Sequence, residues 1–375
     1  MSELREILTE SITRLLDNEV TKEVLAGAEQ GLWPQALWEA LESNGLTRAL
    51  VAEGHGGAGA SFEDVFAIAY ALGRASAPVP LTETLAAGWI LSQAGLDVPS
   101  GPLALIDASS GALEPNAART SVSGCSASVP WGRKVGYVVV VLGAGDEREV
   151  MMVATGAEEP NSTGAVNVLC QENMAGEPRD TLVFVDAPII ASAAFPGPDS
   201  APGSVQHNAE MPANIVVMLG ALMRAAQMAG ACAWVLDTTL TYATDRVQFG
   251  RPLAKLQAIQ HYLATLASRS AQATMAGETA FVSFDRGGEE IDDVAMDIGV
   301  AKIIAGDAAR SATSVGHQIH GALGFTAEYD LHYRTRRLWC WQPEFGSEAH
   351  WAAAIGRSAV AAGADALWPN MTRTR

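Results

Sequence analysis

The chain has 375 residues, 49% of them hydrophobic, which is enough for two or three domains with buried cores. Asp and Glu number 42 against 24 Lys and Arg, and the formal charge of −18 argues against nucleic acid and anionic membranes as partners. The four cysteines are scattered without Cys-x-x-Cys spacing, as in reduced cytoplasmic proteins. Without a basic and apolar leader or a long apolar run, the sequence predicts a cytoplasmic protein.

Residues 1–98 predict an all-helical N-terminal domain, because apolar residues recur at helical spacing between Gly and Pro breaks. Ser61 lies three residues before Asp64, which indicates a helix start. The Gly-rich turn at 53–59 lacks a P-loop lysine, so we interpret it as structural.

Residues 99–205 predict a small β-barrel or sandwich. Short β-branched runs at 137–142, 149–154, 165–169 and 181–185 are separated by turn residues at 143–146 and 160–164. A segment rich in Pro and Gly at 195–203 predicts a linker to the next domain.

Residues 206–375 predict a helical bundle. The stretch 212–244 contains only two Gly, which allows a helix of roughly 50 Å. A second helix shows one apolar face from Leu256 to Leu266, and a third is predicted from near Asp292 to about His317. Helices of this length are typical of a four-helix bundle.

A polar corner at 245–261 joins the first two long helices. The guanidinium of Arg246 offers five fixed donors that match dinucleotide phosphates. Gln248 and Gln257 can hydrogen-bond to the edges of a heterocyclic ring or a ribose, and Phe249 can pack against a ring. The alternative is an ordinary turn in which Arg246 is solvated and Phe249 anchors the loop.

A second motif at 318–326 reads Gln-Ile-His-Gly-Ala-Leu-Gly-Phe-Thr. Gly321 and Gly324 permit close backbone approach to a ligand, because they lack a Cβ. A helix end closed by glycine near 321 also explains the glycines, but it leaves the amide of Gln318 unused.

Together the two motifs resemble the Arg-x-Gln-Phe-Gly and Gln-x-x-Gly-Gly-x-Gly-Phe segments of the acyl-CoA dehydrogenase family. The resemblance implies an α+β fold with a helical N-terminal domain, a β-barrel middle domain and a C-terminal helical bundle. It also implies FAD-dependent α,β-desaturation of an acyl-CoA, an acceptor such as electron-transfer flavoprotein, and a homo- or hetero-tetramer whose flavin lies across a subunit interface.

The resemblance further implies which residues contact the cofactor: Arg246, Gln248, Phe249, Gln257, Gln318, Gly321, Ala322, Gly346 and Ser347. Ala322 replaces the family's second glycine, where a methyl group would crowd the cofactor. Ser128 stands in the segment that carries the family's flavin-facing tryptophan, and Trp131 follows three residues later. Trp131 either shields the flavin or belongs to the core of the barrel.

Desaturation needs a base that takes the proton from Cα while hydride leaves Cβ for the flavin. Counted from Gln318, the family's glutamate position holds Phe345, and the family's other base location maps to about Gly220. Glu344, adjacent to Phe345, is therefore the candidate catalytic residue, although a loop carboxylate is commonly solvated. Glu348 lies one helical turn further on.

Phe345 is also compatible with three kinds of protein that need no base at this position of the chain. A partner subunit can supply a complete active site, as in heterotetrameric enzymes acting on steroid side-chain thioesters. The chain can catalyse a related flavin reaction without this carboxylate, or it can be a structural subunit without catalysis of its own.

The arginine-rich segment 334–337 either meets phosphates or is bonded to carbonyls and acidic neighbours. The histidines show no metal-ligand spacing, so the sequence predicts no metal site. The sequence contains no Gly-x-Ser-x-Gly elbow and gives no support to a serine hydrolase.

Overall fold

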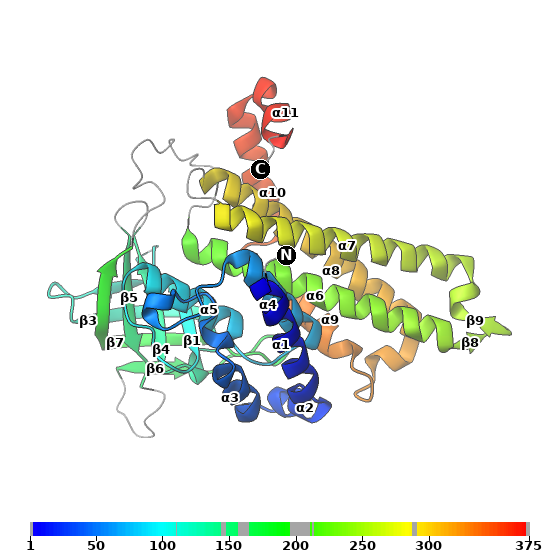
Figure 1. Cartoon of the computed structure of the whole chain (residues 1–375), viewed down its shortest axis with the longest axis horizontal. Helices are drawn as coiled ribbons and strands as arrows, with labels where there is room; N and C mark the ends of the chain where they lie inside the picture. The colour runs from blue at the N-terminus through cyan, green and yellow to red at the C-terminus, as the bar shows by residue number, and fades with distance from the viewer. Residues whose placement is uncertain are drawn as a thin grey trace.

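The computed structural model describes residues 3–109, 111–143, 148–156, 165–195, 211, 214–286 and 291–372. In Figure 1 a curled sheet lies at one end of a bundle of long helices, and the N-terminal helices pack beside both. The predicted loop residues 144–146 and 160–164, and the linker beyond residue 195, lie outside the described residues. The domain boundaries at 98 and 205 stay predictions.

The N-terminal part is helical, as predicted. Its α-helices are α1 (Glu3–Glu19), α2 (Lys22–Glu29), α3 (Gln35–Ser43), α4 (Phe62–Ala75) and α5 (Leu81–Gln93). Ser61 caps α4, because its hydroxyl accepts from the Asp64 amide while the Asp64 carboxylate accepts from the Ser61 amide. The predicted helix start is therefore confirmed.

The Gly-rich turn at 53–59 is a tight structural turn. Arg48 donates to the carbonyls of His55 and Gly56. A Cβ on Gly57 would lie 2.1 Å from the Val51 carbonyl oxygen, so only glycine fits there. The backbone contacts of the turn are thus made within the N-terminal part.

The middle part is one seven-stranded sheet. Its strands are β1 (Leu103–Asp107), β2 (Leu113–Pro115), β3 (Ser121–Pro130), β4 (Tyr137–Leu142), β5 (Glu149–Ala154), β6 (Val166–Leu169) and β7 (Arg179–Ala194). The order is β1-β4-β5-β7-β3-β2, with β6 also paired to β7. The predicted barrel is thus a curled sheet with β1 and β2 at its two ends.

The C-terminal part is a helical bundle built around α6. Its α-helices are α6 (Ile215–Asp245), α7 (Gln257–Arg286), α8 (Ile291–His320), α9 (Leu331–Trp341), α10 (Glu348–Ala362) and α11 (Ala364–Thr372). Helix α6 has the length and composition of a membrane span, but 89% of its most apolar window is buried inside the protein. Its apolar side chains therefore form the core.

Helices α4 and α6 cross with their backbones in contact. A Cβ on Gly73 would lie 1.8 Å from the Gln227 carbonyl oxygen, and one on Gly230 would lie 1.9 Å from the Tyr70 carbonyl oxygen. The two glycines therefore set how closely the N-terminal helices approach the bundle.

The two sequence motifs lie at the same end of the bundle. A short hairpin of β8 (Val247–Gln248) and β9 (Arg251–Pro252) joins α6 to α7, and the 3-10 helix η7 (Gly321–Phe325) follows α8. Tyr242 near the end of α6 stacks on His320 at the end of α8, with ring centroids 4.4 Å apart. Figure 1 shows the hairpin at the tip of the bundle, far from the sheet.

Candidate functional site

The corner at residues 245–261 exposes three of its polar side chains and one aromatic ring. Phe249 is 87% exposed. The side chains of Arg246, Gln248 and Gln257 are exposed and make no hydrogen bond or ion pair with any described residue. The corner is therefore not a turn anchored by Phe249, and its donors are available to a ligand or a second chain.

The second motif presents a similar surface. Gln318 is exposed and its amide makes no hydrogen bond within the described part of the chain. Gly321 has a φ of +59°, which closes α8, and Ala322 is exposed beside it. Phe325 is 72% exposed and stacks on His317, with ring centroids 4.2 Å apart.

This donor set fits a flavin nucleotide. A free guanidinium suits phosphates, free amides suit ribose and ring edges, and exposed aromatic rings offer stacking surface. The other two predicted contacts, Gly346 and Ser347, lie elsewhere, in the loop that joins α9 to α10. Ser347 caps α10 by accepting from the His350 amide.

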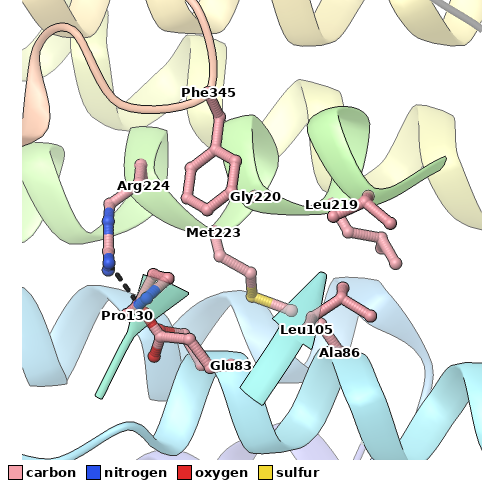
Figure 2. Close-up of a pocket in the computed structure, with 11 residues that line it drawn as sticks. Glu83, Ala86, Leu105, Pro130, Leu219, Gly220, Met223, Arg224 and Phe345 are labelled. Atoms are coloured by element: carbon pink, nitrogen blue, oxygen red, sulfur yellow. Dashed lines mark hydrogen bonds and ion pairs between the residues drawn. The ribbon is translucent and has the colours of Figure 1, made fainter. Parts of the chain in front are cut away.

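That loop lies over the start of α6, beside a mostly apolar pocket between α5 and α6. The cavity volume of the α5–α6 pocket is only about 20 Å³. Figure 2 shows the residues that line it: Thr82, Glu83, Ala86, Leu105, Pro130, Val216, Leu219, Gly220, Met223, Arg224 and Phe345. An adjoining hollow of about 340 Å³ reaches Ser126, Ser128, Arg179 and Glu344.

The ring of Phe345 packs against Gly220 (Figure 2). A Cβ on Gly220 would lie 2.2 Å from Cδ1 of Phe345, so the ring fills the space that any other residue would need. Phe345 has a φ of +54°, and its carbonyl accepts from Nε1 of Trp351 at 3.1 Å. The two positions at which a base was expected therefore face each other, and neither carries a carboxylate.

Glu344 points instead into a pair of arginines. Its two carboxylate oxygens accept from Nε of Arg179 and Nε of Arg224, each at 2.7 Å. Burial raises the pKa of this carboxyl, but the two guanidinium groups outweigh burial and hold the pKa below its ordinary value. The expectation of a solvated loop carboxylate is wrong, because both oxygens are paired.

The pair belongs to a buried network of three arginines and three glutamates. Arg224 also donates to Glu83 at 2.7 Å, while Glu177 accepts from Arg179 at 3.0 Å and from Arg337 at 3.1 Å. Burial opposes ionisation of Glu177, yet Arg179, Arg337 and Arg224 lower its pKa to about 2. Positive and negative charges in the network are equal in number.

Lys302 on α8 fixes the start of the loop. Its side chain is buried, and Nζ donates to the carbonyls of Trp341 and Gln342 at 3.1 and 2.8 Å. These carbonyls end α9, so the lysine satisfies groups that the helix leaves open. Burial lowers the pKa of Lys302 to about 8.

Sequence reasoning missed Glu83, Arg179, Arg224 and Lys302. One signal was present for Arg224, because it is the single charged residue between Ile215 and Leu236 of an otherwise apolar helix. A charge in such a stretch is almost never buried without a partner. The other three have no comparable signature.

The structure decides the remaining predictions for Trp131 and Glu348. Trp131 is a core residue, because it is buried and packs edge-on against Trp33, with ring centroids 6.3 Å apart. The carboxylate of Glu348 accepts from Arg310 at 2.9 Å. The described residues contain no group of three His, Cys, Asp or Glu side chains that could hold a metal ion.

The arginine-rich segment 334–337 is structural. Its three guanidinium groups donate to partners within the chain: Arg334 to the carbonyls of Arg74 and Ala75, Arg336 to Glu29, and Arg337 to Glu177. Arg334 also lies over the ring of Trp234, 4.0 Å from its centroid. Of the two interpretations of this segment, bonding to carbonyls and acidic neighbours is therefore confirmed.

A helical N-terminal part, a curled sheet and a helical bundle, with nucleotide-type donors at an exposed turn, define a flavin-dependent oxidoreductase. Residues 2–97 match the description "Acyl-CoA dehydrogenase, N-terminal domain", and residues 215–359 match "Acyl-CoA dehydrogenase, C-terminal domain". These two matches take in more than half of the chain. The chain belongs to the acyl-CoA dehydrogenase family, which is a family of FAD-dependent oxidoreductases.

Individual proteins agree with this assignment. The chain is 28% identical to acyl-CoA dehydrogenase IpdE2 of Mycolicibacterium smegmatis, over 90% of this chain and 93% of that protein. The ChsE4-ChsE5 complex of Mycobacterium tuberculosis has a chain with a TM-score of 0.76 at 20% identity, covering 97% and 99% of the two chains. Butyryl-CoA dehydrogenase from Megasphaera elsdenii has a TM-score of 0.77 at 18% identity, and the match covers 96% of this chain and 98% of that one.

Proposed function

We propose that this chain is one subunit of a heteromeric FAD-dependent acyl-CoA dehydrogenase and that its partner supplies the catalytic base. The observation that carries the proposal is the ring of Phe345 on Gly220. Of the carboxylates that line the α5–α6 pocket and the adjoining hollow next to this ring, Glu83 and Glu344 are both bound to Arg224. The third, Asp107, lies in the hollow and accepts from the backbone amide of Ser109 at 2.9 Å. Glu344, whose pKa the two arginines lower, is a weak proton acceptor at Cα of a thioester.

The flavin nucleotide is expected to lie across the subunit interface. Arg246, Gln248, Phe249, Gln257, Gln318, Gly321 and Ala322 would hold it from one end of the bundle. Gly346 and Ser347 lie near the other end of α6, roughly 30 Å away at 1.5 Å per residue from Gly220 to Tyr242. Two chains that meet at the exposed corner would complete a site that one chain presents only in part.

The reaction is then α,β-desaturation of an acyl-CoA. When bound, FAD supplies the hydride acceptor. Residues of this chain would bind and orient the nucleotide, while a carboxylate of the partner would take the Cα proton. Electron-transfer flavoprotein is the expected acceptor, and a cytoplasmic tetramer the expected assembly.

A specific set of residues favours a second candidate function, a structural subunit without any part in catalysis. Phe345, Ser128 and Ala322 all depart from the family's pattern. The unpaired donors at Arg246 and Gln318 favour the first proposal, because a purely structural subunit has no use for them.

The visible spectrum tests the first of these functions. The full chain is purified alone and, through an affinity tag, from its own cells with whatever subunit accompanies it. We expect a colourless chain, and a yellow complex that acyl thioesters bleach without oxygen. A chain that binds flavin and is bleached alone would contradict the missing base, and a complex that is colourless would remove the cofactor claim.

A further inference from the structure

We propose that Arg224 is the positioning residue that keeps the α5–α6 pocket closed to an acyl chain, an inference that rests on the proposed function of this chain. Arg224 follows Gly220 by one helical turn, so the two positions share a face of α6. Its guanidinium carbon lies 6.0 Å from the ring centroid of Phe345, and its Nε donates to Glu344 at 2.7 Å.

Arg224 acts on two consecutive loop residues in different ways. The ion pair draws Glu344 out of the α5–α6 pocket, while the guanidinium lies near the ring of Phe345. An arginine over an aromatic ring is attractive, and more so when both groups are shielded from water. Phe345 is thereby held against Gly220 and not in the solvent-facing part of the loop.

The backbone of the loop is fixed from both sides. Lys302 binds the carbonyls of Trp341 and Gln342 before Phe345, and Trp351 binds the carbonyl of Phe345 itself. With the backbone fixed, the position of the ring depends on the side chains that surround it. Among the residues that line the pocket with this ring, Arg224 carries the positive charge, and its guanidinium carbon lies 6.0 Å from the ring centroid.

The guanidinium of Arg224 is fully paired within the protein and is not available to a ligand. Its side chain is 4% exposed and is bound to Glu83, Glu344 and Gln227. A ligand carboxylate would add an unbalanced negative charge to a network that is already neutral, which is costly in a buried site. Arg224 therefore closes the pocket and does not offer a site for an anionic acyl group.

The position of Phe345 can be followed directly by fluorine NMR on the full, flavin-free chain. Phenylalanine is replaced by 4-fluorophenylalanine, and the Phe345 signal is identified by its loss in Phe345→Leu. We expect Arg224→Met to shift or broaden that signal and to expose it to a solvent-isotope effect. The matched control is Arg74→Met, which removes a half-exposed arginine from its pair with Asp237 and should leave the signal unchanged.

Thermal unfolding shows whether Arg224→Met is folded. If the variant unfolds cooperatively and its Phe345 signal has not moved, the proposal is overturned. If Arg224→Met does not fold, Arg224→Lys decides instead. That variant keeps the charge but loses the planar fork. It should shift the Phe345 signal in the same direction by less, and an unmoved signal would again contradict the proposal.

Closure is tested with N-acetylcysteamine thioesters of four to eight acyl carbons. An open apolar pocket strengthens binding about fourfold for each buried methylene, whereas a closed one gives no dependence on length. We expect the affinity of the wild-type chain not to change with the number of acyl carbons. The affinity should rise steeply with acyl length in Phe345→Ala and less steeply in Arg224→Met. A length dependence in the wild type, or none in Phe345→Ala, would overturn the proposal.

Both measurements use the chain without flavin or partner. Failure of the proposed function, seen as flavin bleaching by the chain alone, is therefore distinguishable from failure of this inference.

Discussion

Two arginines bind the carboxylate of Glu344 inside the protein, so removing its charge should lower the free energy of unfolding. Glu344→Gln leaves Arg179 and Arg224 without their shared partner. Removing one member of a buried pair costs about 3 kcal/mol. Urea unfolding of the full chain should show this loss in the free energy of unfolding.

Asp237→Asn is the control for that substitution. Asp237 pairs with Arg74, but its side chain is 58% exposed. Exposed pairs contribute about 0.5 kcal/mol. Equal losses in the two variants would mean that the Glu344 pair is no stronger than a surface pair.

Lys302 should make stability depend on pH in the alkaline range. Burial lowers its pKa from 10.5 to about 8, so between these values the unfolded chain binds more protons than the folded one. Stability attributable to Lys302 therefore rises as pH rises from 8 to 10.5, by about 3 kcal/mol in total.

Lys302→Met should remove that rise. The test is the difference between wild type and variant in urea unfolding at several pH values, because the tyrosines that titrate in the same range cancel in the difference. A difference that stays constant from pH 7.5 to 10.5 would show that Lys302 keeps its ordinary pKa in the fold.

At the level of single residues, sequence reasoning reached the two positions that matter but not their contact. Phe345 and Gly220 were each located by counting from a motif. Their packing depends on a loop with positive φ at Phe345 and on a lysine from a third helix, and neither has a local sequence pattern. The burial of Glu344 was missed for the same reason, since its arginine partners come from β7 and α6.

Among the elements, the α4–α6 crossing gives a sharp prediction. Gly73→Ala or Gly230→Ala would place a Cβ within 2 Å of a backbone carbonyl of the other helix. The helices must separate, at a cost of about 2 kcal/mol or more. Thermal unfolding should show a lower melting temperature for both variants.

Gly356→Ala on α10 is the matched control. It makes the same chemical change inside a helix, but nothing lies within 4 Å of the added Cβ. Alanine is the better helix former by about 1 kcal/mol, so this variant should be slightly more stable. A similar loss in all three variants would exclude a steric cause.

Elements with a clear pattern were predicted well, and those without one were missed. β4 and β5 begin and end at the predicted residues, because each is a run of β-branched or apolar residues between turns. β3 was missed because Ser121–Pro130 is rich in serine and contains a glycine, and β7 runs nine residues beyond the predicted 185. In both strands, pairing with neighbours in the sheet outweighs local propensity.

For the whole molecule, flavin binding should depend on protein concentration. If the nucleotide lies between two chains, dilution separates the chains and releases it by mass action. We expect flavin fluorescence of the tagged complex to rise on dilution at fixed ionic strength. Occupancy that stays constant over a hundredfold dilution would place the nucleotide within one chain.

Arg246→Ala in the complex should lower flavin content at every concentration. Arg246 is exposed and its side chain has no partner among the described residues, so the melting temperature of the isolated chain should not change. A variant that loses stability but keeps its flavin would show that Arg246 supports the fold and not the cofactor.

The contact between Phe345 and Gly220 makes the two positions epistatic. A carboxylate regained at 220 collides with the ring at 345, and one regained at 345 meets the guanidinium of Arg224. Neither single substitution places an unpaired base in the pocket, so a base of its own would require at least two coordinated changes. Under the proposed function, no single substitution at these two positions would free the chain from its partner's base.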